Sequence, residues 1–168
     1  LSLGAGPAWA AAPPGEYQIK AAYLLNFARY MEWPAARLPI GALLRLCVLG
    51  RDPFGGALMG LEGRQVNGHE MRLRQIEGVD QAGDCHLVFI ADSEERRLGL
   101  LLRGLAGKGV LSVSDADGFA EAGGGIGLVV EDGRVRFDIN QAALLRDGLR
   151  ASSQLLRLGR NVLGVRGF

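Results

Sequence analysis

The sequence predicts an α/β fold: a mainly parallel, twisted β-sheet with helices on both faces and an antiparallel hairpin near the C-terminal end. Short apolar runs alternate with helical segments, as in domains whose parallel strands are joined by crossover helices. An Asp-Gly pair at 132–133 then separates two strand-like runs, which is the strongest short signal for a hairpin. We expect one domain, over residues 16–168, that buries about 70% of its unfolded surface.

The alternating part of the chain contains four strand-like runs and two helical segments. The strands are predicted at 43–50, 71–76, 85–92 and 110–115, and the helices at 54–63 and 93–107. Apolar and polar residues alternate in 71–76, which is typical of an edge strand, whereas the other three runs are mostly apolar and should be buried. Ser93 is the expected N-cap of its helix, with Glu94 and Glu95 in the first turn, where the helix dipole favours acidic groups.

The last part of the chain contains the hairpin and two further helices. The hairpin covers residues 126–140, and along its second strand Val135, Phe137 and Ile139 face one way. Residues 141–149 and 152–164 are predicted helices. Ser152 or Ser153 is the expected N-cap of the last one.

Residues 21–34, AAYLLNFARYMEWP, predict a helix that is apolar around most of its circumference. An ordinary surface helix buries an apolar stripe of only about 100°, so this helix must be covered on two sides. It could lie between the sheet and the C-terminal helices, or part of it could contact a partner or a second subunit. In the second case the exposed members of one set would make the contact: Phe27, Tyr30, Met31 and Trp33.

The first fifteen residues differ from the rest in composition. LSLGAGPAWAAAPPG is uncharged and rich in small residues, and it contains the A-x-A pattern Ala8-Trp9-Ala10 of a signal-peptide cleavage site. We interpret residues 1–15 as a signal-peptide remnant and leader, with a mature protein that starts near Ala11. A disordered Ala/Pro/Gly leader is the alternative. The expected product is a periplasmic protein exported through a cleaved signal peptide.

The two cysteines fit an oxidising compartment. Cys47 lies in the first buried strand and Cys85 just before the third, and in an open α/β sheet these strands are commonly neighbours. One bridge would then stabilise the fold by roughly 4 kcal/mol in the chain-entropy model. The alternative is two buried thiols that behave as small apolar side chains.

Motifs for chemistry are sparse. The GGGIG run at 123–127 precedes a strand, whereas a dinucleotide fingerprint follows one, so we interpret it as a loop. DADG at 115–118 lacks the later ligands of a calcium loop. GRDPFGG at 50–56 follows a strand and could hold an anion on its amides, although a plain turn is favoured. His69 and His86 have no nucleophile beside them, so we expect no active site, no metal and no cofactor.

The charge distribution gives little indication of a partner. The formal net charge is +1, so a nucleic-acid partner is not expected. Arginines outnumber acids in the C-terminal segment, which either forms a second contact surface or is simply a solvated face. That segment contains Arg146, Arg150, Arg157, Arg160 and Arg166, with Asp147 as its acid.

Five blocks of the sequence occur in an order and at spacings that carry a family resemblance. They are EYQIKAAYLLNFARYMEWP, LRLCVLGRDPFGGAL, CHLVFIADSE, LSVSDADGFAEAGGGIGLVVEDGRVRFDIN and SSQLLRLGRNV, and together they span about residues 16–163. The chain resembles the YfiR family of periplasmic proteins. The resemblance implies an α/β domain, usually a homodimer, that inhibits a membrane-bound diguanylate cyclase through its periplasmic sensor region. An outer-membrane lipoprotein can sequester such an inhibitor.

The same resemblance links the cysteines to redox control, because Cys47 and Cys85 match a family cysteine pair. The second pair that some members carry is absent from this sequence. We therefore expect a non-enzymatic regulator that lowers cyclic di-GMP and biofilm formation. The alternative is a periplasmic small-ligand sensor, in which an anion binds at residues 50–56 or against Arg136.

Overall fold

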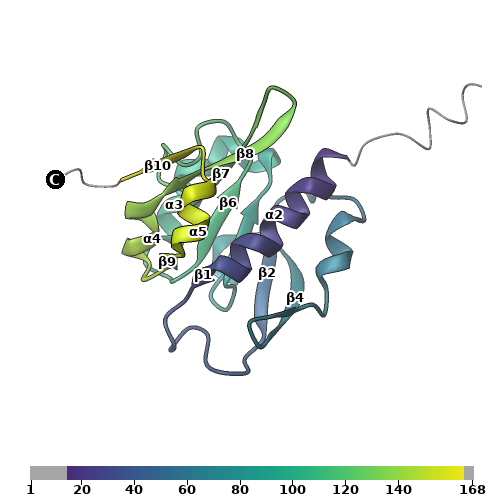
Figure 1. The fold of residues 1–168 in the computed structure, drawn as a ribbon, viewed down its shortest axis with the longest axis vertical. Helices are drawn as coiled ribbons and strands as arrows, with labels where there is room; N and C mark the ends of the chain where they lie inside the picture. Colours follow the sequence, from purple (N-terminus) through teal and green to yellow (C-terminus); the bar gives the residue numbers. More distant parts are fainter. Residues whose placement is uncertain (1–14, 165–168) are drawn as a thin grey trace, which may run out of the picture.

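An eight-stranded β-sheet lies at the centre of the fold in this computed structural model, which describes residues 15–164 (Figure 1). The strand order is β10-β8-β7-β6-β5-β2-β4-β3. The strands are β2 (Leu44–Leu49), β3 (Gln65–Val66), β4 (His69–Ile76), β5 (Leu87–Ile90), β6 (Leu111–Ser114), β7 (Ile126–Glu131), β8 (Arg134–Asn140) and β10 (Asn161–Leu163). The five strands from β7 to β4 in this order run parallel, which confirms the predicted mainly parallel sheet.

Helices cover both faces of this sheet. They are α2 (Glu16–Tyr30), α3 (Leu98–Leu105), α4 (Gln141–Arg146) and α5 (Ser153–Leu158), with 3₁₀ segments η1 (Ala57–Leu61), η2 (Val79–Gln81) and η3 (Asp92–Arg97). In Figure 1 α2 and α5 lie on the near face, and the buried residues of α2 belong to the core on that face. The core beneath α3 is separate and contains Leu101, Leu102 and Leu105.

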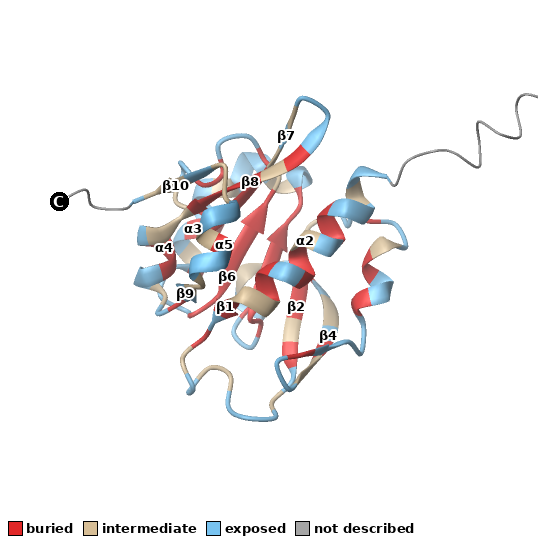
Figure 2. Cartoon of the chain, viewed as in Figure 1, coloured by how far each residue is buried: buried red, intermediate tan, exposed pale blue. Residues whose placement is uncertain are grey.

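The alternation of side chains along a strand explains the two cores. On β2, Leu46 and Val48 belong to the core under α2, whereas Cys47 and Leu49 belong to the core under α3. The central strands are accordingly buried almost throughout, while the outward sides of the helices are exposed (Figure 2). Apart from Arg45, the sequence run of β2 is apolar because both faces of a parallel sheet are covered.

The N-terminal helix α2 is covered on two sides within the chain itself. It contacts η1, α5 and β8 (Figure 1). Part of the expected cover therefore comes from within the chain, but α5 lies beside α2 on the same face of the sheet, so the helix is not enclosed between the sheet and the C-terminal helices. After Tyr30 the chain leaves the helix and forms β1 (Met31–Glu32), which pairs antiparallel with β9 (Arg150–Ala151) in a separate two-stranded sheet.

The predicted hairpin at 126–140 is confirmed as β7 and β8. Its turn residues Asp132 and Gly133 both have positive φ, 53° and 74°, as a tight two-residue turn requires. Val135, Phe137 and Ile139 are buried, as predicted. Asp138 on the opposite face is also buried, because Arg160 covers it with hydrogen bonds of 2.9 and 2.7 Å.

The run 71–76 is an edge strand, as predicted: the short β3 pairs only with His69 and Glu70 at the start of β4, and residues 71–76 have β2 as their one strand partner. A second hairpin joins β3 to β4 through Asn67 and Gly68, with φ of 52° and 84°. The run 152–164 is not one helix: α5 ends at Leu158, and β10 then pairs in parallel with β8.

The helices between the strands are shorter than predicted. Segment 54–63 contains only the 3₁₀ helix η1, because the four glycines of the segment lower its helix propensity. Segment 93–107 divides into η3 and α3, and Ser93 is not an N-cap. Its hydroxyl instead accepts a hydrogen bond from the backbone N–H of Arg51, at 3.0 Å. Ser152 is confirmed as the N-cap of α5, because its hydroxyl accepts from the N–H of Leu155 at 3.1 Å.

Candidate functional site

The two cysteines are joined by a disulfide between neighbouring strands. Cys47 lies on β2 and Cys85 immediately precedes β5, which pairs with β2, and their Cα atoms are 6.1 Å apart. Both residues are fully buried beneath α3. The bridge therefore links two strands in the interior of the domain, where a partner protein does not contact it directly.

The four candidate contact residues of the N-terminal helix are placed differently from one another. Phe27, Met31 and Trp33 are buried inside the chain, with 0, 5 and 7% of their surface exposed. Phe27 lies edge-on against Phe137, and the indole N–H of Trp33 donates to the backbone oxygen of His86 at 3.0 Å. Of the set, only Tyr30 keeps a half-exposed side chain that a partner could touch.

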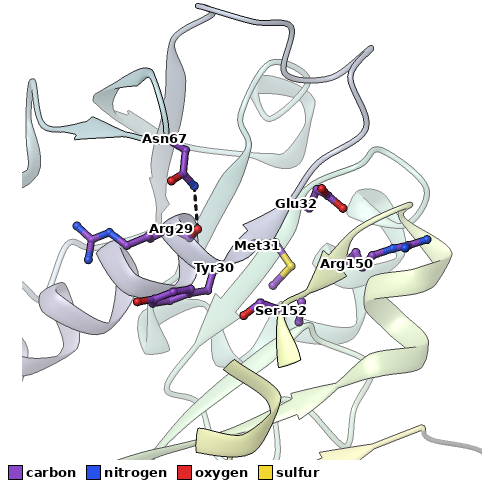
Figure 3. Close-up of a pocket in the computed structure, with 8 residues that line it drawn as sticks. Arg29, Tyr30, Met31, Glu32, Asn67, Arg150 and Ser152 are labelled. Atoms are coloured by element: carbon purple, nitrogen blue, oxygen red, sulfur yellow. Dashed lines mark hydrogen bonds between the residues drawn. The ribbon is translucent and has the colours of Figure 1, made fainter. Parts of the chain in front are cut away.

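Tyr30 lines a cleft at the junction of α2 with the small sheet formed by β1 and β9 (Figure 3). The cleft has a volume of about 320 Å³ and is lined by Arg29, Tyr30, Met31, Glu32, Asn67, Arg150, Ala151 and Ser152. The side-chain amide of Asn67 donates to the backbone oxygen of Arg29 at 2.8 Å and so joins the β3–β4 turn to the end of α2. We call this site the Tyr30 cleft.

The polar groups at the margin of the Tyr30 cleft come from distant parts of the sequence. Glu32 and Arg150 are opposite each other in the β1–β9 pair, and both are exposed. Figure 3 shows Arg29 and Arg150 on opposite sides of the cleft. A half-buried aromatic ring with charged groups around it is the arrangement that protein interfaces commonly use.

Arg136 lies in a second and larger hollow, between α2, β8 and α5. This hollow has a volume of about 680 Å³ and is lined by Ile19, Tyr23, Gly133, Arg134, Val135, Arg136, Phe137, Arg157, Leu158 and Gly159. Three arginines therefore line one site, and its lining contains no Asp or Glu. We call this site the arginine groove. Arg136 was predicted as an anion contact and Arg157 as part of the C-terminal arginine segment, but the sequence could not place them in one site, because α5 reaches β8 only through the tertiary fold.

The predicted anion site at 50–56 has the wrong charge. The loop lies at the carboxyl ends of β2 and β5, where ligands bind in many open α/β sheets. However, its hollow is lined by Asp52, Glu77 and Glu94, against a single Arg51. The side chain of Asp52 also occupies the backbone N–H of Phe54, at 2.7 Å. Repulsion between carboxylates and an anion disfavours this half of the sensor hypothesis.

Both histidines hydrogen-bond to the backbone, which is typical of a structural role. The Nδ1 atom of His86 accepts from the backbone N–H of Arg45 at 3.0 Å, so its Nε2–H donates to the backbone oxygen of Arg37 at 2.8 Å. Burial lowers the pKa of His86, which keeps the ring neutral. His69 is 2.7 Å from the backbone oxygen of Ala42. Within residues 15–164 no group of three or more His, Cys, Asp or Glu side chains could hold a metal ion.

These features define a small, disulfide-bridged α/β domain whose candidate sites are clefts between its helices and strands. The chain belongs to the YfiR/HmsC-like family, whose model matches residues 17–160. The predicted family resemblance is confirmed by this match. The family is one of periplasmic regulators in cyclic di-GMP signalling. Across the part of the chain that the structure describes, no helix is both long and apolar enough to span a membrane.

Two solved structures share the fold at low sequence identity. An ABC domain from Streptococcus pneumoniae, solved in complex with L-Trp, is 8% identical with a TM-score of 0.57, and the match covers 85% of this chain and 60% of that one. A conserved domain protein from Vibrio cholerae is 10% identical with a TM-score of 0.56, covering 90% and 61%. The chain thus spans about 60% of the length of these proteins. The likeness concerns the fold alone.

Proposed function

We propose that this protein inhibits a membrane-bound diguanylate cyclase by binding its periplasmic sensor region, and so lowers cyclic di-GMP and biofilm formation. The family match over residues 17–160 carries this proposal. The protein acts by binding, without a catalytic step and without a cofactor. Its place in the periplasm, after removal of a signal peptide, is part of the proposal. The predicted signal-peptide remnant and leader cover residues 1–15, of which 1–14 lie outside the described residues.

Inhibition of this kind requires only unequal binding to two states of the cyclase. If the protein binds the inactive conformation more tightly, it shifts the equilibrium toward that conformation by tenfold for about every 1.4 kcal/mol of difference. A ligand that binds both conformations equally shifts nothing. The contact surface must therefore recognise a feature of the partner that changes between the two states.

The Tyr30 cleft is our proposed contact surface. Tyr30 offers a half-buried ring, and its neighbours Arg29, Glu32 and Arg150 provide charged groups of both signs around it. A partner side chain in this cleft would be enclosed by α2, β1 and β9, which the Met31–Ala151 and Glu32–Arg150 pairs hold in place. Met31 lines the cleft although little of its surface is exposed, whereas Phe27 and Trp33 are buried in the core and do not contact the partner.

Two further associations complete the proposal. The protein forms a homodimer, and an outer-membrane lipoprotein sequesters it and thereby releases the cyclase. The likeness to the family supports both as proposals. Competition between the lipoprotein and the cyclase for one surface would explain how sequestration relieves inhibition.

Binding of purified protein to the isolated periplasmic region of its cyclase tests the contact surface. We expect Tyr30→Ala and Arg150→Glu each to weaken this binding, with a loss of about 2 kcal/mol for a buried interfacial aromatic. Leu100→Ala is the matched control, because Leu100 is 60% exposed on α3, on the other face of the sheet. Thermal unfolding of each variant checks that the fold is intact. Unchanged affinity in both cleft variants would exclude the Tyr30 cleft.

A further inference from the structure

The arginine groove combines positive charge with an apolar wall. Arg134 and Arg136 lie on β8, and Arg157 lies on α5, so arginines from two elements line the groove. Guanidinium groups bind carboxylates and phosphates through paired hydrogen bonds. The charge of the lining therefore selects an acidic group.

The guanidinium groups of the groove retain free donors. Arg134 and Arg157 make no ion pair with any residue between 15 and 164. Arg136 has one contact, at 3.5 Å, with an oxygen of Glu131. The other oxygen of Glu131 binds Arg160 at 3.2 Å, and Arg160 also takes both oxygens of Asp138. The acids near the groove are thus shared with Arg160, which does not line it.

The groove also has an exposed apolar wall. Ile19 and Leu158 are exposed to 38 and 65%, although both are large aliphatic residues. Tyr23 lies between them and the strand, and its hydroxyl donates to the backbone oxygen of Val135 at 3.0 Å. That hydrogen bond fixes the ring as a wall of the groove. An exposed aliphatic surface beside three arginines suits a molecule that is apolar at one end and acidic at the other.

We propose that the arginine groove binds a small amphiphilic acid, whose phosphate or carboxylate contacts Arg136 and Arg157 and whose apolar body lies on Ile19, Tyr23 and Leu158. A volume of about 680 Å³ falls in the range of small-molecule sites, which supports a single free molecule. This site is separate from the Tyr30 cleft, and its occupation does not depend on the proposed inhibition.

Titration calorimetry with decyl phosphate, below its micelle concentration, tests the proposal. We expect saturable binding of one molecule per chain. Inorganic phosphate has only the charged group, and decanol has only the apolar chain. Each is expected to bind at least about tenfold more weakly than decyl phosphate, because the charged and apolar contacts both contribute. Equal binding of inorganic phosphate would reduce the groove to a simple anion site and overturn the proposal.

Two variants and one control locate the binding. The double substitution Arg136→Gln and Arg157→Gln should lower the affinity for decyl phosphate by at least about tenfold, the loss expected when charge-assisted hydrogen bonds are removed. Leu158→Ser should weaken binding of decyl phosphate and leave that of inorganic phosphate unchanged. Arg103→Gln is the control, because Arg103 is an exposed arginine on α3. Its affinity should equal that of the unchanged protein.

Vesicles distinguish a free acid from a lipid surface. The protein should not be retained on phosphatidylglycerol vesicles beyond its retention on phosphatidylcholine vesicles. Retention on phosphatidylglycerol without binding of monomeric decyl phosphate would overturn the proposal in favour of a membrane contact. Binding of decyl phosphate that survives in the double arginine variant would also overturn it, because the acid would then bind elsewhere.

Discussion

Lys20 and Asp115 form a buried ion pair, with 2.8 Å between Nζ and Oδ2 and side chains only 3 and 7% exposed. The pair joins α2 to the carboxyl end of β6. The hydroxyl of Tyr17 donates to the same oxygen of Asp115. Burial and the neighbouring Asp115 carboxylate raise the pKa of Tyr17, so this hydroxyl remains a donor at every physiological pH. Oδ1 of Asp115 has no hydrogen-bond partner among residues 15–164.

Removal of one partner of this pair should destabilise the protein strongly. Lys20→Met leaves the Asp115 charge buried without its cation, and we expect a loss of about 3 kcal/mol in the free energy of unfolding. The double variant Lys20→Met with Asp115→Asn should recover much of that loss, because no buried charge remains. Urea unfolding measures both values. Arg72→Met, which breaks an exposed pair with Glu62, is the control and should cause no comparable loss.

A double variant that is as unstable as Lys20→Met alone would contradict this explanation. The side chain of Lys20 would then matter through its aliphatic contacts and not through its charge.

Stability should fall as the pH drops below about 6.5 because His86 is buried in its neutral form. Burial lowers the pKa of His86 below its ordinary value of 6.5. The unfolded chain therefore takes up a proton at a pH where the folded protein does not, so acid favours unfolding. The contribution is complete above pH 6.5 and is lost progressively as the pH falls from 6.5 toward the folded pKa. Urea unfolding midpoints between about pH 7.5 and 5, the range in which histidines titrate, measure this contribution.

His86→Gln provides the comparison for this pH dependence. Its stability should be lower overall, since the hydrogen bonds to Arg45 and Arg37 change, but its slope in this pH window should be flatter. Asp138 does not interfere. Hydrogen bonds from Arg160 lower its pKa from 3.8, so its contribution is lost only in stronger acid. An unchanged slope in His86→Gln would assign the pH dependence to another group.

The bridge between Cys47 and Cys85 should stabilise the exported protein substantially. The two cysteines are 38 residues apart in sequence, for which the chain-entropy model gives about 4 kcal/mol. Urea unfolding of the oxidised protein, the reduced protein and the Cys47→Ala, Cys85→Ala double variant measures this contribution. The reduced protein and the variant should be similarly destabilised. Ready labelling of both thiols by a maleimide in the folded, exported protein would show that the bridge does not form there.

The ion pairs of Arg160 should hold β10 against β8. Asp138→Asn keeps the shape of the side chain but removes the charge that Arg160 binds at 2.7 and 2.9 Å. We expect faster hydrogen exchange at the backbone amides of β10, whereas exchange in β5 should be unchanged. Equal protection of β10 in both proteins would mean that backbone pairing alone holds this strand.

Features that depend on neighbouring residues were predictable from the sequence, whereas features that depend on distant residues were not. The hairpin at Asp132-Gly133 was predictable because its positive φ angles are a local requirement. The Asn67-Gly68 turn carries the same signal, but the two-residue strand before it is too short for a periodic pattern. The end of α5 was missed because β10 forms only where β8 is present to pair with it.

The candidate sites depended still more on tertiary structure. A helical wheel predicted that α2 is covered on two sides but could not say by what. Phe27 and Trp33 were therefore grouped with Tyr30, although both are buried in the core of the chain itself. Lys20 looks like an ordinary surface lysine in sequence. Its burial depends on Asp115, which is 95 residues away. Arg157 and Arg136 line the same groove because α5 lies beside β8, an arrangement that the sequence does not reveal.

Measurement of cellular cyclic di-GMP after deletion of the gene tests the proposed inhibition most directly. We expect the level to rise on deletion in a strain that has the cognate cyclase and to stay constant in a strain that lacks it. The unchanged gene and Leu100→Ala should restore the low level, whereas Tyr30→Ala should not. An unchanged cyclic di-GMP level on deletion in the strain with the cyclase would contradict the proposed function.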